Sequence, residues 1–98
     1  MADDFLTRAV WYGTQAKVFA REGRGDEAQA LVHEAVALIE ETDLLSHRGD
    51  AMLDLADVLT TCGRAAEAER AVAAALALYE RKGNAAAATR ARERRQGS

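Results

Sequence analysis

Proline is absent from the 98-residue sequence, and cysteine occurs once, as Cys62. A single cysteine excludes an intrachain disulfide and any metal site built from several cysteines. No apolar run approaches the roughly 18 residues that a membrane-spanning helix needs, and the N-terminus lacks the apolar core of a signal peptide. We therefore expect a cytoplasmic protein that makes no contact with a membrane.

Hydrophobic residues make up 49% of the chain, and most of them are alanine, leucine and valine. Without proline, this composition favours α-helices over strands and a packed domain over a disordered chain. The length leaves room for one hydrophobic core. The sequence therefore predicts a single all-α domain over residues 1–98.

The sequence repeats itself with a period of 40 residues. Ala9–Glu40 aligns with Gly49–Glu80 without a gap, and eleven of the 32 positions are identical. The motif Gly-Arg-x-x-Glu-Ala begins at Gly23 and again at Gly63. A fixed period of this length is typical of repeat architectures, so we expect each repeat to form a pair of antiparallel helices.

Glycines mark the ends of the predicted helices. Gly23, Gly63 and Gly83 each follow an apolar-periodic stretch, where glycine can adopt the positive φ that closes a helix. Asn84 is a favourable N-cap for a last helix. The predicted helices span about 5–22, 26–42, 46–62, 65–82 and 85–95.

Apolar residues recur at helical spacing within these segments. Met52, Leu55, Ala56 and Leu59 lie at i, i+3, i+4 and i+7, which is one face of a helix. We expect such faces to form the core, with regularly placed alanines letting paired helices approach closely. These alanines are Ala16, Ala28, Ala35, Ala56, Ala68 and Ala75. In the first segment the apolar face offers Trp11, Tyr12, Ala16, Val18 and Phe19.

This arrangement of residues resembles the tetratricopeptide repeat (TPR). A TPR hairpin carries a large residue, a small residue four positions later, a second large residue, a turn glycine and two spaced alanines. Those roles fall on Tyr12, Ala16, Phe19, Gly23, Ala28 and Ala35, and again on Met52, Ala56, Leu59, Gly63, Ala68 and Ala75. The period departs from the usual length of about 34 residues, and Glu40 and Glu80 stand where a proline often ends the repeat.

The resemblance implies a right-handed solenoid of helical hairpins. Repeat 1 would span about 5–42, repeat 2 about 46–82, and a short capping helix about 85–95. The longer period agrees with the long-helix TPR variety of bacterial signalling proteins.

A second resemblance covers about residues 11–94 and is carried by the runs 48–59, 62–64 and 76–84. These runs are similar to the C-terminal TPR region of actinobacterial adenylate/guanylate cyclase-like or transcriptional-activator signalling proteins. None of the cyclase or nucleotide-binding motifs of those proteins occurs in the sequence. The resemblance therefore implies a repeat fragment or a small relative of a bacterial signalling regulator.

Residues with catalytic or metal-binding chemistry are few. His33 and His47 have no cysteine or carboxylate at a ligand spacing that forms a known site, so we interpret both as surface residues. Asp50, Asp54 and Asp57 share one helix face and could attract a cation. We expect a solvated acidic stripe instead, because no loop carbonyls converge there. The sequence predicts no enzyme activity, no cofactor and no bound metal.

The TPR resemblance also implies a concave groove lined by the first helix of each hairpin, where members of the family usually bind peptides or partner helices. The positions that carry over are Val10, Gly13, Lys17, Ala20 and Arg21 in repeat 1, and Asp50, Leu53, Asp57, Thr60 and Thr61 in repeat 2. They lack the Lys/Asn pattern with which some TPR domains hold a C-terminal carboxylate. The alternative is that they are ordinary solvated helix surface.

Charge is unevenly distributed along the chain. Residues 1–80 carry seven cations and fifteen anions, a net charge of −8, whereas residues 81–98 carry a net charge of +5. We interpret the basic tail first as a solvated helix and second as a contact with the acidic body of another copy. Nucleic-acid binding ranks third, because no aromatic residues stand near the tail for base stacking.

Two hairpins and a cap fall short of the roughly three repeats that a solenoid usually needs for stability. Phe5, Leu6, Val10 and Trp11 on the first predicted helix are therefore candidates for a self-association surface. The sequence predicts a non-enzymatic scaffold or adaptor that binds a protein or peptide partner. The alternatives are a homodimerisation element and a regulatory domain that binds a peptide or small ligand.

Overall fold

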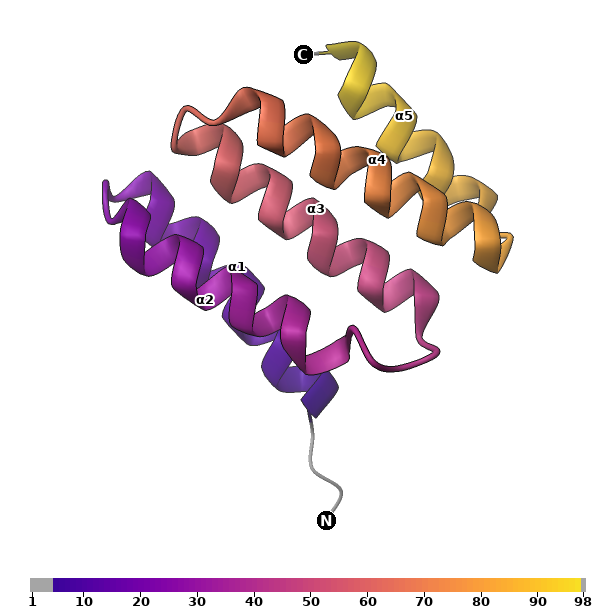
Figure 1. Ribbon diagram of the computed structural model, residues 1–98, viewed down its shortest axis with the longest axis horizontal. Helices are drawn as coiled ribbons and strands as arrows, with labels where there is room; N and C mark the ends of the chain where they lie inside the picture. Colours follow the sequence, from indigo (N-terminus) through magenta and orange to yellow (C-terminus); the bar gives the residue numbers. More distant parts are fainter. Residues whose placement is uncertain (1–4, 98) are drawn as a thin grey trace.

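A computed structural model describes residues 5–97, which form five α-helices (Figure 1). These are α1 (Phe5–Arg21), α2 (Gly25–Ile39), α3 (Leu45–Thr61), α4 (Ala65–Lys82) and α5 (Ala85–Gly97). The described part of the chain contains no strand, so the prediction of an all-α protein is confirmed. None of the described helices combines the length and apolarity needed to cross a membrane.

Successive helices run antiparallel, and α3 lies at the centre of the arrangement (Figure 1). α3 packs against α1 and α2 of the first hairpin and against α4 of the second, while α5 packs against α4. The molecule is flat, with principal extents of 41 × 36 × 17 Å. α3 is therefore the element that joins the first helix pair to the second.

Three glycines close helices where the sequence predicted that they would. Gly23, Gly63 and Gly83 have φ values of 83°, 81° and 80°, a conformation that is strained for a residue with a Cβ. Asn84 caps α5, since its Oδ1 accepts the backbone N–H of Ala87 at 3.2 Å. Its Nδ2 donates to Ser46 Oγ at 3.1 Å, which ties the start of α5 to the start of α3.

The predicted end of the second helix is wrong by three residues, because α2 ends at Ile39 rather than at about residue 42. The hydroxyl of Thr42 donates to the Ile39 carbonyl at 2.7 Å and accepts the N–H of Leu44 at 3.2 Å. Arg48 donates to the Thr42 carbonyl at 3.2 Å. These bonds satisfy groups that a helix end leaves unpaired, and they turn the chain into α3 without a glycine.

Alanine dominates the core. In the described part of the chain, thirteen of the twenty buried hydrophobic residues are alanine, and the six alanines predicted to allow close approach are all 5% exposed or less. The largest fully buried side chain is Tyr79 of α4. Trp11 differs from the prediction of an apolar core face on the first helix, since it is 61% exposed. The helices therefore meet mainly through methyl groups rather than through large side chains.

Two glycines inside helices leave room for side chains of neighbouring helices. A Cβ on Gly49 of α3 would lie 2.6 Å from the ring of Tyr79, and a Cβ on Gly13 of α1 would overlap the carboxylate of Asp54. Glycine in a helix interior costs about 0.5–1 kcal/mol relative to alanine. The closer packing of α3 against α4 and α1 offsets that cost.

We expect Gly49→Ala to lower the free energy of unfolding by about 1–3 kcal/mol, because the new methyl group overlaps the buried ring of Tyr79. The gain in helix propensity, at most about 1 kcal/mol, is too small to compensate. Gly13→Ala is the comparison, since its methyl group meets the tip of the Asp54 side chain, which can turn away. Urea unfolding of both variants measures the difference, and equal stability of the two would contradict this packing.

Candidate interaction surface

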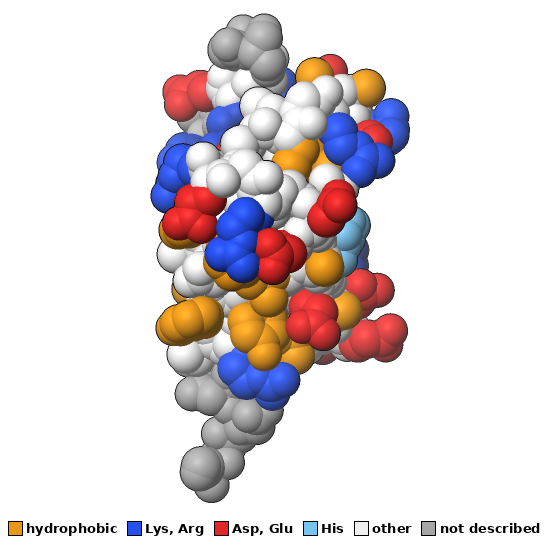
Figure 2. All heavy atoms as spheres, turned by 90° about the vertical axis from the view of Figure 1, so that its left-hand side faces the viewer, with side chains coloured by type: hydrophobic (Ala, Val, Ile, Leu, Met, Phe, Trp, Pro, Cys, Tyr) orange, Lys and Arg blue, Asp and Glu red, His pale blue; other side chains and the backbone are white. Residues whose placement is uncertain are grey.

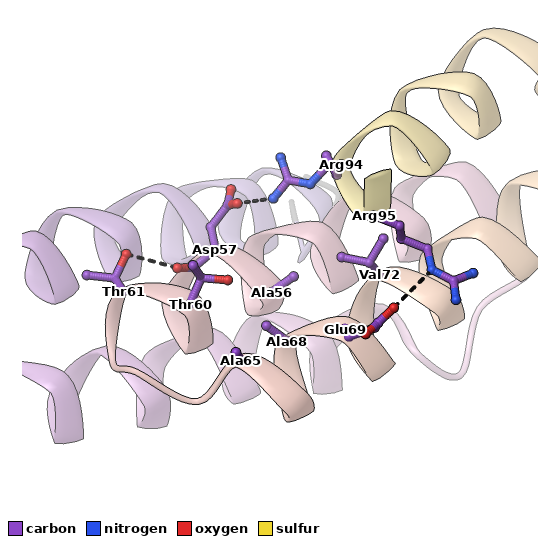
Figure 3. A pocket seen from close by; sticks show the side chains of 10 residues that line it. All are labelled: Ala56, Asp57, Thr60, Thr61, Ala65, Ala68, Glu69, Val72, Arg94 and Arg95. Carbon is purple, nitrogen blue, oxygen red and sulfur yellow. Dashed lines mark hydrogen bonds and ion pairs between the residues drawn. The ribbon is translucent and has the colours of Figure 1, made fainter. Parts of the chain in front are cut away.

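A strip of ion pairs joins α1, α3 and α5. Lys17 of α1 places its Nζ 2.9 Å from Asp54 Oδ1 and 3.9 Å from Asp57 Oδ2. Arg94 of α5 also pairs with Asp57 (Figure 3). The two carboxylates lie on the same face of α3, because they are three residues apart. Asp57 is thus shared between a cation of the first helix and a cation of the last.

Asp50, which precedes Asp54 by one turn of α3, accepts a hydrogen bond from the Tyr79 hydroxyl at 2.5 Å. Tyr79 is otherwise fully buried. This bond satisfies the Tyr79 hydroxyl, which burial would otherwise leave without a hydrogen-bond partner. Burial, together with the bond to Asp50, raises the pKa of Tyr79 above its ordinary value.

The prediction of a solvated acidic stripe is wrong for Asp54 and Asp57, because α1 and α5 supply cations that pair with them. The Asp54 side chain is only 22% exposed, since the absence of a side chain on Gly13 lets it lie against α1. Burial raises the pKa of Asp54; the Lys17 ammonium opposes this shift, and the neighbouring carboxylates add to it. Among the described residues, no group of three or more His, Cys, Asp or Glu side chains is placed to hold a metal ion.

Beside the strip lies a hollow of about 530 Å³ between α3, α4 and α5 (Figure 3). Its apolar lining comes from Ala56 of α3 and from Ala65, Ala68 and Val72 of α4. The small alanine side chains leave the space between α3 and α4 unfilled at this point. A partner could place an apolar side chain there and remove both surfaces from water.

Two ion pairs at this hollow connect α5 to the second hairpin (Figure 3). Arg94 pairs with Asp57 of α3, and Arg95 Nε lies 3.5 Å from Glu69 Oε2 of α4. All four side chains remain partly exposed to solvent. Exposed pairs of this kind contribute little to stability, so these groups can exchange partners with a ligand at low cost.

Only part of the predicted groove is brought together. Asp57, Thr60 and Thr61 line the hollow, and Lys17 reaches toward Asp57 from α1. The predicted groove residues that do not line this hollow are Val10, Gly13, Lys17, Ala20, Arg21, Asp50 and Leu53. The Thr61 hydroxyl is already engaged, since it donates to the backbone carbonyl of Asp57 at 3.0 Å.

Three of the predicted groove residues face inward. Gly13 and Ala20 are buried on α1, and Leu53 is half-buried against the core. These three positions therefore offer little surface to a ligand, and the groove itself stays a prediction. Val10 is 57% exposed, and Arg21 is exposed as well, but both stand apart from the hollow.

Sequence reasoning missed Glu69, Arg94 and Arg95, which line the hollow. The first interpretation of the basic tail is a solvated helix, yet Arg94 and Arg95 pair with carboxylates of the same chain. Arg92 adds a third such pair, 2.7 Å from Glu80. The sequence signal for these ion pairs is the opposite net charge of residues 1–80 and 81–98. Because α5 packs against α4, the pairs form within one chain.

The two histidines lie on different helices. His33 of α2 and His47 of α3 are both exposed, which confirms their interpretation as surface residues. Cys62, a free thiol at the end of α3, is half-buried.

The chain matches no protein-family model, no curated protein and no solved structure. A function for it therefore rests on its own residues and their geometry.

We expect Asp54→Asn to stabilise the protein at pH 7 and to lose this effect in acid. The raised pKa means that the folded state binds the Asp54 proton more tightly than the unfolded state. The contribution of Asp54 to the stability of the fold is therefore fully present below its ordinary pKa of 3.8. It is lost as the pH rises through the higher pKa that Asp54 has in the folded protein. Urea unfolding at pH 3.5 and pH 7 measures the change, with the exposed Asp43→Asn as control. A variant less stable than the wild type at pH 7 would show that the Lys17 pair outweighs burial.

Proposed function

We propose that this protein is a non-enzymatic interaction module of TPR-like architecture that binds a protein or peptide segment at the hollow between α3, α4 and α5. The observation that carries the proposal is the hollow itself, in which an apolar lining is bordered by exposed ion pairs. Ligand sites commonly combine an apolar lining with a few polar groups that fix orientation. In this proposal the protein acts in the cytoplasm as a scaffold or adaptor related to bacterial signalling regulators.

The internal repeat supports a right-handed solenoid of helical hairpins. Gly23 and Gly63, which are 40 residues apart, close α1 and α3 with nearly the same φ. Alanines with the same separation are buried in both hairpins, namely Ala16 and Ala56, Ala28 and Ala68, and Ala35 and Ala75. The two hairpins therefore use equivalent residues for equivalent contacts, as repeats of a solenoid do.

The chemistry of the hollow suits binding. Its volume of about 530 Å³ falls within the range of about 300–1,000 Å³ that ligand pockets occupy. Its carboxylates, Asp57 and Glu69, each pair with an arginine, and a guanidinium keeps its proton at neutral pH. A segment with an apolar residue next to an acidic one would fill the hollow and take the arginines from their present partners.

Thr60→Trp tests the proposal, because Thr60 is exposed at the hollow and an indole there would fill it without entering the core. Peptides of twelve residues would be selected from a random displayed library on the wild-type protein, and their affinities measured by fluorescence anisotropy. We expect Thr60→Trp to weaken binding by at least about tenfold, which corresponds to about 1.4 kcal/mol.

The matched control is Thr89→Trp, an exposed threonine of α5 that does not line the hollow. It should leave affinity for the selected peptides unchanged. If no peptide is enriched, or if the selected peptides bind Thr60→Trp as tightly as the wild type, the hollow is not the binding site.

A further inference from the structure

We propose that two copies of this chain associate through the outer face of the first hairpin, which is the side of α1 and α2 that faces away from α3. On α1 this outer face consists of Trp11, Gln15 and Val18, and on α2 it includes Leu38. The inference is independent of the hollow between α3, α4 and α5.

The corresponding face of α3 shows how these positions pack. Ala51 clusters with Ile39 of α2, and at the other end of the face the Cys62 sulfur lies 3.2 Å from where a Cβ on Gly25 of α2 would stand. Leu55 and Val58 lie between them, at i+4 and i+7 from Ala51, and both are buried. This face of α3 is therefore the one that α2 covers.

Trp11, Gln15 and Val18 of α1 occupy the positions 40 residues before Ala51, Leu55 and Val58. Trp11 is 61% exposed, and Gln15 and Val18 are partly exposed. Among the described residues no helix lies over them as α2 lies over α3.

The position of Trp11 in α1 and Ala51 in α3 recurs in α5 as Ala91, which is 0% exposed and belongs to the core cluster. The position is thus buried in α3 and in α5 but exposed in α1, where it carries the largest side chain of the three.

α2 contributes to the same side of the hairpin. Leu78 of α4, which lies 40 residues after Leu38, lines the gap between α4 and α2 together with Val36 and Ile39. By this equivalence Leu38 points away from the second hairpin. Figure 2 looks onto the side of the molecule where the first hairpin lies, and hydrophobic side chains gather in its lower half among charged ones.

Charge selects a second copy as the occupant of this face. Of the three cations of α1, Lys17 pairs with Asp54 and Asp57 of α3, and the other two are Arg8 and Arg21. α1 has no acidic residue, whereas α2 carries three acidic residues and no lysine or arginine. A twofold axis parallel to the hairpin places the basic α1 of each copy on the acidic α2 of the other. The interface is then self-complementary and closed, as in most homodimers, and both contacts pair opposite charges.

The area of the outer face sets the affinity expected for the dimer. The seventeen residues of α1 span about 26 Å, and two such helices about 10 Å apart offer a footprint of roughly 500 Å². Stable complexes bury about 800 Å² per partner. We therefore expect a dimer with a dissociation constant in the micromolar range rather than a permanent one.

Sedimentation equilibrium over about 1–500 μM, read together with tryptophan emission, tests the proposal. Trp11 is the chain's only tryptophan, so its emission should shift to shorter wavelengths over the concentrations at which the mass doubles from 10.6 kDa. We expect Trp11→Ala to raise the dissociation constant by at least about tenfold, as a central tryptophan at an interface does. Circular dichroism should show unchanged helicity, because Trp11 is not part of the core.

Val10→Ala is the matched control. Val10 is 57% exposed on the same helix, but its counterpart in α3 is Asp50, which bonds Tyr79 of α4 rather than facing α2. This variant should dimerise like the wild type. Equal weakening by the two substitutions would overturn the proposed face.

A monomer at every concentration, with unchanged emission, would overturn the proposal. The remaining occupant is an acidic amphipathic helix from another chain, for which a synthetic peptide of the α2 sequence Gly25–Ile39 serves as the probe. If the protein stays monomeric but this peptide shifts the Trp11 emission, the outer face binds a foreign helix and not a second copy.

Discussion

Close approach between helices, made possible by alanine and glycine at the points of contact, is the constraint on which the rest of the structure depends. It lets α3 touch α1, α2 and α4 at once, and it lets Gly49 receive the ring of Tyr79. An alanine buries little apolar surface, so the fold is held by many small contacts rather than by a few large side chains. Interfaces of this kind leave little room for added methylene groups.

The same constraint positions the candidate interaction surface. One face of α3 packs on α2, a second presents carboxylates toward α1, and a third packs against α4 beside the hollow. α5 is held near both ends, since Asn84 bonds Ser46 at its start and Arg94 pairs with Asp57 near its end. The charge asymmetry of the sequence is therefore used within the chain, where the basic last helix neutralises carboxylates of α3 and α4.

The helices and the repeat could be predicted from the sequence because their signals are local. Gly23, Gly63 and Gly83 stand beside the helices that they end, and apolar spacing reports the buried face of α3, although in α1 it also marks Trp11, which is exposed. The site could not be predicted in the same way, because it depends on how helices cross. Nothing near Gly13 in the sequence shows that Asp54 rests on it, and nothing near Arg94 shows that Asp57 is within its reach.

The free energy of unfolding of Ala16→Leu, measured in urea, tests the claim of close packing most directly. Ala16 is 0% exposed and Ala30 is exposed on α2, so Ala30→Leu is the control. The account predicts a loss of about 1–3 kcal/mol for Ala16→Leu and a change within about 0.5 kcal/mol for Ala30→Leu. If Ala16→Leu were as stable as the wild type or more stable, the interfaces would have room to spare, and close approach could not be what fixes the fold.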